Sequence, residues 1–186
     1  IEQIIFILTG EVVNYSDRWL GIVAGTKPPG NSPHTVAEAI RKHGLIPEEM
    51  LPWTDDLQNV DEYYSFKGGE EWKCDLEAQD FLKKYEIGYE DVWKGNISIE
   101  EKKKRVKEAL QYSPLGLAVS AWYLKNGVYV DNGVSNNHWV CAYGYNEQGI
   151  KVFDSYDSEK KLVSWEHKNS VCIRYHLEKQ ATTQEI

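Results

Sequence analysis

The stretch NNHWVCAYGYNEQGIKVFDSY, residues 136–156, contains the clearest fold signal in this chain. Two β-branched and aromatic runs, residues 137–145 and 150–154, flank the polar turn Glu147-Gln148-Gly149. Runs of this composition separated by a short glycine-containing turn are typical of two antiparallel strands. The stretch therefore predicts a β-hairpin with a histidine near the start of its first strand.

The segments around this hairpin predict further strands after Pro114 and helices before it. The other strand-like runs are residues 115–121, 128–130 and 171–176. Helical patterns cover residues 1–8, 16–20, 33–43, 75–85 and 99–112, whereas residues 46–73 show no clean period and predict an irregular segment. Helices followed by strands are typical of an α+β architecture, with a mainly helical lobe beside an antiparallel β lobe.

The composition indicates a folded and acidic protein. Hydrophobic residues make up 41% of the 186 residues, and the formal net charge is -8. A nucleic-acid binder needs a basic footprint, so this charge argues against nucleic acid as a partner. The basic run at residues 102–105 follows acidic residues and predicts a solvated helix face.

No part of the sequence has the length and hydropathy of a membrane span, so we expect a soluble chain without a membrane partner. Because the sequence begins at Ile1 rather than Met, we expect that an N-terminal targeting region is not part of these residues, and the compartment is not predicted. The three cysteines, Cys74, Cys141 and Cys172, form no CxxC or Cys/His cluster. We therefore expect neither a disulfide framework nor a metal site, and no cofactor.

His138 is the candidate general base, because it begins a strand directly after a turn-rich loop. Side chains alternate along a strand, so His138 and Val140 share a face while Cys141 points away. A nucleophilic thiol must lie within hydrogen-bond reach of its base, so Cys141 is not predicted to be the nucleophile. Cys141 and Cys172 are expected in the core, whereas Cys74 is expected to be partly exposed.

Asp154 is the candidate partner of His138. Antiparallel pairing across the hairpin returns Asp154 toward the histidine. A carboxylate beside the far ring nitrogen of a catalytic imidazole fixes its tautomer and stabilises the imidazolium. From these two residues alone, a structural hydrogen bond is a more common interpretation than catalysis.

Short motifs follow one another over most of the chain. They are residues 1–10 with Asn14-Tyr15-Ser16 and Leu20, then Gly30-Asn31-Ser32-Pro33, Ala37, His43-Gly44-Leu45-Ile46, Glu48, Leu51-Pro52-Trp53, Ser113 to Val119, Asn137-His138 to Gly144-Tyr145, and Asp154-Ser155-Tyr156. Their order resembles that of the papain-like cysteine peptidases, and the first of them resembles the family's central helix and the helix that follows it. The family's central helix begins with the nucleophilic cysteine, so the resemblance places that cysteine roughly a dozen residues before Ile1.

The resemblance implies a role for each matched residue. His138 would act as general base and acid, Asp154 would orient it, and Tyr156 would shield their hydrogen bond from water. The substrate, a peptide or protein, would be bound by Gly30, Asn31, Pro33, Ala118 and Asn137. Without the nucleophile, residues 1–186 are expected to be inactive.

Three matched positions depart from the family pattern: Asp154 replaces Asn, Tyr156 replaces Trp and Asn31 replaces a glycine. The family's disulfide cysteines are also missing, which removes the argument for an oxidising compartment. Two alternatives therefore stay open. One is a non-catalytic papain-like domain that binds a peptide or protein, and the other is a transglutaminase-like Cys-His-Asp acyl transferase.

The resemblance also implies a domain organisation. Residues 1–112 would form a helical lobe truncated at its N-terminus, residues 113–177 an antiparallel, β-barrel-like lobe, and residues 178–186 a frayed tail. The active-site groove would lie between the two lobes. The domain is expected to be a monomer once its N-terminal segment is present.

Overall fold

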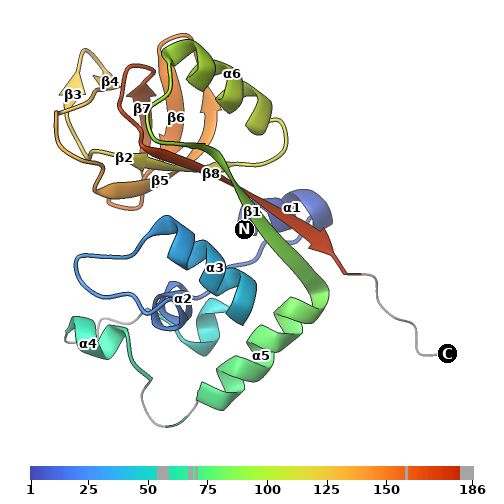
Figure 1. Cartoon of the computed structure of the whole chain (residues 1–186). Coiled ribbons are helices and arrows are strands. Elements are labelled where there is room, and N and C mark those ends of the chain that lie inside the picture. The colour runs from blue at the N-terminus through green and yellow to red at the C-terminus, as the bar shows by residue number, and fades with distance from the viewer. Residues whose placement is uncertain (54–58, 67–68, 70, 158, 181–186) are drawn as a thin grey trace. The chain divides into compact units, whose positions relative to one another are not determined.

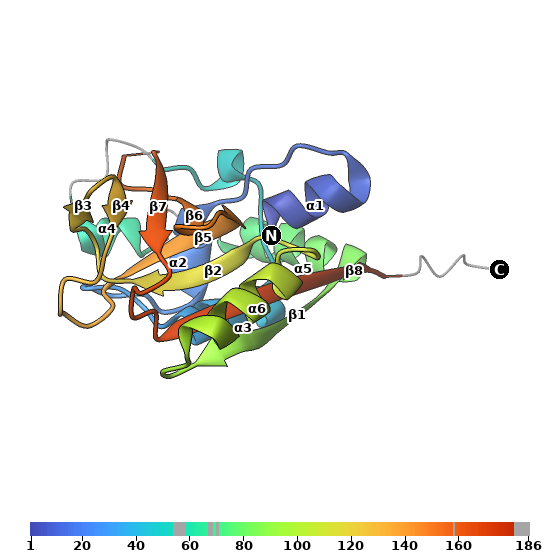
Figure 2. The same cartoon turned by 90° about the horizontal axis from the view of Figure 1, so that it is seen from above.

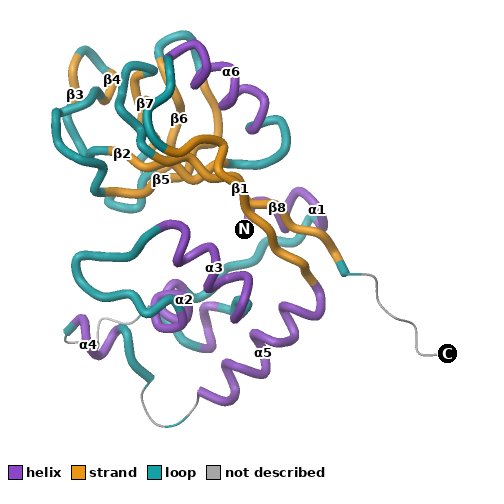
Figure 3. The backbone as a smooth tube through the Cα atoms, in the orientation of Figure 1, coloured by secondary structure: helices purple, strands orange, loops and turns teal. Residues whose placement is uncertain are grey.

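The computed structural model describes residues 1–53, 59–66, 69, 71–157 and 159–180. Within these residues the protein has six α-helices, one 3-10 helix and eight strands, which confirms the mixed α+β class (Figure 1). The chain forms two compact units: Ile1–Gly88 together with the chain from Leu177 onward, and Tyr89–His176. Figure 3 shows that helices predominate in the first unit and strands in the second.

Capping residues and glycines mark the ends of several helices in the first unit. They are α1 (Glu2–Thr9), α2 (Asp17–Val23), α3 (Pro33–His43), α4 (Val60–Tyr63) and α5 (Glu71–Lys84), with the 3-10 helix η1 (Glu48–Met50). Ser16 caps α2, since its Oγ accepts a 3.0 Å hydrogen bond from the Trp19 N–H. Gly10 and Gly44 end α1 and α3 with positive φ angles. The first three predicted helices are confirmed.

Trp19 is a core residue of the first unit. Its side chain packs with Ile46, Cys74 and Ala78, and its indole N–H donates to the Gly44 carbonyl oxygen at 3.1 Å. The prediction that Cys74 is partly exposed was wrong, because this side chain is only 2% exposed. Helix α5 turns Cys74 onto the same apolar face as Ala78, one turn later.

The segment 46–73, predicted to be irregular, is helical in places. It includes η1, α4 and the first residues of α5, while residues 54–58, 67–68 and 70 lie outside the described part of the chain. The buried guanidinium of Arg18 donates hydrogen bonds to the carbonyl oxygens of Glu62, Tyr63 and Ser65. Helices of one turn contain too few residues to show a hydrophobic period, so the sequence pattern does not reveal them.

The strands form one sheet in the order β1-β8-β2-β5-β6-β7-β4-β3. They are β1 (Tyr85–Lys94), β2 (Leu115–Val119), β3 (Leu124–Lys125), β4 (Val128–Tyr129), β5 (His138–Tyr145), β6 (Gly149–Phe153), β7 (Lys160–Ser164) and β8 (Val171–Lys179). All five predicted strands are present, and β1, β3 and β7 were not predicted. Among the described residues the order is open, so the predicted barrel-like closure is not confirmed. The prediction of an antiparallel sheet was wrong for one pair, β4 with β7, which is parallel.

Helix α6 (Ile99–Ala109) packs on the sheet within the second unit, and Figure 2 shows it from above. The basic run at residues 102–105 was predicted to be a solvated face, but Lys102 is only 5% exposed. It lies one helical turn before Val106 and therefore on the same, core-facing side. Lys102 Nζ donates to the carbonyl oxygens of Trp165, at 3.1 Å, and of His167. Burial lowers the pKa of Lys102 to about 8.

Replacing Lys102 by methionine is expected to lower the free energy of unfolding by about 2–4 kcal/mol. Methionine keeps much of the apolar stem but leaves buried oxygens of Trp165, His167 and Asn169 without this donor. Urea unfolding followed by tryptophan fluorescence measures the change. The matched control is Lys104→Met, because Lys104 lies on the exposed face of the same helix. Equal effects of the two substitutions would contradict a structural role for the buried ammonium.

The predicted lobe boundary at residue 112 stays a prediction, and the two compact units divide after Gly88. Helix α6 belongs to the second unit because its apolar face packs on that unit's core. The tail, predicted to be frayed from residue 178, is ordered at its start because β8 extends to Lys179, and residues 181–186 lie outside the described residues. In the described part of the chain, no helix combines the length and the apolar character of a membrane span.

Candidate active site

The hairpin of β5 and β6 brings His138 and Asp154 together; Figure 1 shows both strands in the second unit. Strand β5 begins at His138, and Asp154 directly follows the last residue of β6. Cys141 of β5 pairs with Phe153 of β6. Continuing this register puts Asp154 opposite Val140, whose side chain shares a face with that of His138. The two side chains therefore meet on the core face of the sheet.

The side chains of His138 and Asp154 share this face because β5 contains a β-bulge. The register of the hairpin shifts by one residue within residues 142–144 of β5. A regular continuation of the pairs nearest the turn would place Asp154 opposite Cys141, whose side chain points away from His138. The extra residue in β5 reverses the face on which Asp154 lies.

His138 and Asp154 form a short hydrogen bond, with 2.6 Å between His138 Nε2 and Asp154 Oδ1. The Asp154 side chain is fully buried and that of His138 is 10% exposed. Because an ionised carboxylate only accepts hydrogen bonds, Nε2 carries the proton, and Nδ1 is the ring nitrogen that remains to accept one. This is the geometry of a general base held by an orienting carboxylate.

Aromatic rings cover two sides of the His138 imidazole. Tyr156 stacks on it with 3.9 Å between ring centroids and 27° between ring planes. Trp122 meets it edge-on at 5.9 Å and 82°. The Tyr156 N–H also donates to Asp154 Oδ1 at 3.2 Å. The stacking supports the predicted shielding role of Tyr156, which stays a prediction.

A buried lysine lies beside the second oxygen of Asp154. Lys161 Nζ is 2.9 Å from Asp154 Oδ2 and 2.6 Å from Asp157 Oδ2. Burial by itself raises the pKa of Asp154, but Lys161, His138 and the Tyr156 N–H outweigh burial and lower this pKa to about 2. Because the folded-state pKa lies below the ordinary carboxyl value, these contacts stabilise the fold at neutral pH. The stabilisation is lost as the pH falls toward 2.

The two cysteines of the second unit have the environment of structural residues. Cys172 is fully buried on β8, as predicted, and burial raises the pKa of its thiol well above the ordinary range. Cys141 is half-buried rather than a full core residue, and burial raises its pKa as well. Strand alternation directs Cys141 away from His138. Since the thiolate is the nucleophile, both thiols are poorly suited to attack at neutral pH.

Two of the predicted substrate-binding residues belong to the second unit. Asn137 is exposed beside His138, and its Oδ1 accepts a 3.0 Å hydrogen bond from the Ala121 N–H. Ala118 is 8% exposed and pairs with Trp139, so it lies on the face of the sheet away from His138. The structure therefore brings Asn137 next to the histidine but not Ala118.

The other three predicted substrate-binding residues lie in the loop before α3 of the first unit. The Gly30 N–H donates to the Lys27 carbonyl oxygen at 2.7 Å and closes a tight turn. Asn31 Nδ2 donates to the Ala24 carbonyl oxygen at 2.8 Å, which ties the loop back to the end of α2. Pro33 is the first residue of α3. Their roles in substrate binding stay predictions.

The sequence analysis missed a second, fully buried histidine, His167. Its Nε2 lies 3.1 Å from Ser120 Oγ and its Nδ1 lies 3.2 Å from Asn169 Nδ2. Asn169 Nδ2 also donates to the Ala118 carbonyl oxygen at 2.8 Å. Ser120 and His167 are both 0% exposed, so this Ser-His-Asn set is a structural network in the core. A lone histidine in a polar loop gave no sequence signal for it.

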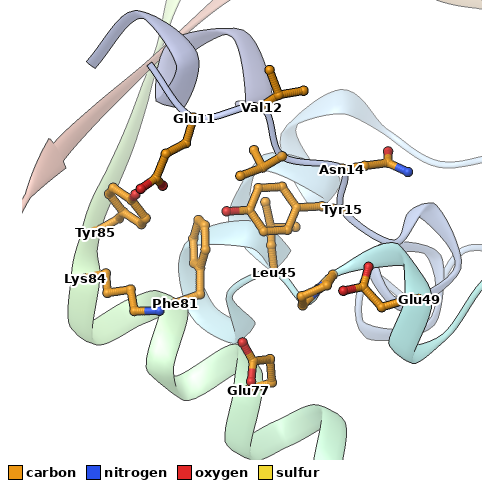
Figure 4. Close-up of a pocket in the computed structure, with 12 residues that line it drawn as sticks. Glu11, Val12, Asn14, Tyr15, Leu45, Glu49, Glu77, Phe81, Lys84 and Tyr85 are labelled. Carbon is orange, nitrogen blue, oxygen red and sulfur yellow. The ribbon is translucent and has the colours of Figure 1, made fainter. Parts of the chain in front are cut away.

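A cavity of about 480 Å³ lies in the first unit (Figure 4). Three carboxylates and three aromatic rings are among its lining groups: Glu11, Glu49, Glu77, Tyr15, Phe81 and Tyr85. Burial, followed by the nearby Tyr85 and Glu2, raises the pKa of Tyr15 to about 12, so its hydroxyl stays protonated at neutral pH. The lining residues come from the first unit, whereas His138 and Asp154 belong to the second.

Comparison with known proteins shows a likeness of fold. No family model matches the sequence, and no curated protein matches it. The structure is similar to the crystal structure of xylellain, a cysteine protease from Xylella fastidiosa, with a TM-score of 0.62 and 13% sequence identity. The match covers 97% of this chain and 75% of that one. The chain therefore has a fold similar to that of a cysteine protease.

Proposed function

We propose that this chain is the histidine- and aspartate-bearing part of a papain-like thiol peptidase. The observation that carries the proposal is the 2.6 Å bond from His138 Nε2 to the buried Asp154. This bond leaves Nδ1 as the nitrogen that accepts the proton of a nucleophile. The likeness of fold to a cysteine protease supports the same conclusion.

In the proposed reaction His138 Nδ1 takes the proton of a cysteine thiol, and the resulting thiolate attacks the carbonyl carbon of a peptide bond. His138 then returns this proton to the leaving amine as the C–N bond breaks, which leaves a thioester. Water, deprotonated by His138, hydrolyses the thioester and restores the thiol. Asp154 stabilises the imidazolium in both halves of the cycle.

The proposal assigns the nucleophile to the part of the protein that precedes Ile1. This assignment is consistent with the thiols of Cys141 and Cys172, because burial raises the pKa of both. The groups that bind the substrate are proposed to be Gly30, Asn31, Pro33 and Asn137, with Tyr156 as the shield of the His138–Asp154 bond. Ala118 is left out because it lies on the face of the sheet away from His138.

Covalent labelling tests this proposal. The full chain, as its gene encodes it, is treated with a thiol-directed peptidyl epoxide, and the modified residue is located by mass spectrometry. We expect one label per molecule on a cysteine before Ile1, and equal labelling of a variant in which Cys74, Cys141 and Cys172 are all serine. Labelling that disappears in the triple variant would place the reactive thiol inside the described chain and contradict the proposal.

The same protein separates the two alternatives. If the acyl-enzyme transfers its acyl group to added amines faster than to water, the chain is an acyl transferase. If the epoxide does not react while an extended peptide still binds, the domain is a non-catalytic binding module. Product analysis by mass spectrometry and calorimetric titration with an unreactive peptide distinguish these outcomes.

A further inference from the structure

We propose that Lys161 is a positioning residue for the histidine, acting through Asp154. It holds Asp154 as an ionised carboxylate, turned so that Oδ1 accepts the hydrogen bond from His138. This inference rests on the proposed function for its catalytic consequence, but its structural part can be tested without any catalysis.

The sheet register places Lys161 beside Asp154. Strand β7 pairs antiparallel with β6, with Lys161 opposite Val152 and Lys160 opposite Phe153. Val152 is fully buried and Phe153 is 45% exposed, so Lys161 points to the core face and Lys160 to the solvent face. A lysine at a core-facing strand position is unusual and needs a specific partner.

Each carboxylate oxygen of Asp154 has a different contact. Lys161 Nζ lies 2.9 Å from Oδ2, while Oδ1 lies 2.6 Å from His138 Nε2 and 3.2 Å from the Tyr156 N–H. Asp157, 45% exposed, is the second carboxylate on Lys161. Oδ1 is thus hydrogen-bonded to His138 and Tyr156, while Oδ2, which accepts no hydrogen bond from the described residues, is held by the ion pair with the Lys161 ammonium.

Two aromatic rings lie close to the Lys161 ammonium. Its side chain is 2% exposed, and its Nζ lies 5.5 Å from the ring centroid of Trp122 and 5.8 Å from that of Tyr129. Both distances are within the range of cation–π attraction. Trp122 also contacts the His138 ring, so the same indole packs against the lysine and the histidine. The ammonium therefore contacts two aromatic rings in addition to the carboxylates of Asp154 and Asp157.

The physical reason for this lysine is the burial of a charge. A fully buried carboxylate favours its protonated form unless a cation compensates it, and a protonated Asp154 would not stabilise an imidazolium. A neutral amide at the same position would need no cation. The proposal therefore predicts that Lys161 matters when residue 154 is Asp and matters little when it is Asn.

The first test measures the carboxylate itself. The full chain is labelled with ¹³C at the aspartate carboxyl groups, and the Asp154 signal is assigned from the D154N variant. We expect Lys161→Met to raise the pKa of Asp154 from its value of about 2, and Lys161→Arg to keep it low. Lys160→Met, on the solvent face of the same strand, should leave it unchanged. An unchanged pKa of Asp154 in Lys161→Met would overturn the proposal. Lys161→Gln repeats the test with a neutral polar side chain and should also raise the pKa of Asp154.

The second test is a double-mutant cycle on activity. With the full chain we expect Lys161→Met to lower kcat about 10- to 100-fold with little change in KM, the effect of one charge-assisted contact in the active site. In the Asp154→Asn background the same substitution should change kcat less than about threefold. An equal loss in both backgrounds would show that Lys161 acts on the fold in general. If the wild-type chain hydrolyses no peptide, the proposed function fails, while the carboxyl titration still decides the role of Lys161.

Discussion

Replacing His138 by alanine in the full chain is expected to lower kcat/KM for peptide hydrolysis by about 10³- to 10⁴-fold. The imidazole is the group whose Nε2 is bound to Asp154 at 2.6 Å, and its Nδ1 is the proton acceptor of the proposed reaction. Without it the thiol keeps its proton, and the leaving amine has no acid. A fluorogenic peptide assay measures the loss, and epoxide labelling should be lost in parallel because both need the thiolate.

Two other histidines are the controls for this prediction. His176 is exposed on β8, so His176→Ala should leave both activity and melting temperature unchanged. His167 is buried in the network with Ser120 and Asn169, so His167→Ala should lower the melting temperature. His138→Ala should lower activity with little change in melting temperature. Activity within tenfold of wild type in folded His138→Ala would reject this histidine as the general base.

Replacing Gly44 by alanine is expected to lower the free energy of unfolding by about 3–5 kcal/mol, a large share of the stability of a typical domain. Gly44 ends α3 with φ 73° and ψ -171°, a combination that residues with a Cβ rarely adopt. A Cβ added there would lie 2.3 Å from the Ala78 carbonyl oxygen, on the backbone of α5. Backbone cannot rotate away as a side chain does, so α3 and α5 would have to separate. Urea unfolding monitored by circular dichroism measures the loss.

Gly10 is the matched control for Gly44. It also ends a helix with a positive φ, but at φ 76° and ψ 0° it is in the left-handed helical region, and an added Cβ would meet nothing within 4 Å. Gly10→Ala should therefore cost only about 1–2 kcal/mol, the price of the backbone conformation alone. If the two substitutions cost the same, the close approach of α3 to α5 at Gly44 contributes nothing to stability.

The elements that the sequence predicted correctly are those with local chemical signals. The Ser16 cap, Pro33 at a helix start and the glycines at helix ends act through neighbouring backbone groups, so their effect is visible in a window of a few residues. The hairpin at residues 136–156 was predicted for the same reason. These signals gave the α+β class and the positions of His138 and Asp154 on neighbouring strands.

The elements that the sequence missed depend on contacts that a local pattern does not show. Strand β1 has the sequence YEIGYEDVWK, in which Glu, Asp and Gly interrupt any alternation, and it lies at the end of the sheet order beside β8. Strand β7 begins with two lysines, and a hydropathy scale places lysine in solvent rather than in a buried strand. Lys161 is buried there because Asp154 and Asp157, in the connection between β6 and β7, compensate its charge once the two strands pair.

The sequence by itself thus determined the fold class, the hairpin and the identity of the histidine and aspartate that it joins. Only the tertiary structure decided that these two side chains share a face, because one bulged residue in β5 reverses the facing of everything beyond it, and side-chain direction in a strand has a period of two. The structure likewise supplied Lys161. A buried charge is stable only where its counter-charge is already in place, and that pairing exists only between strands that the chain has brought together.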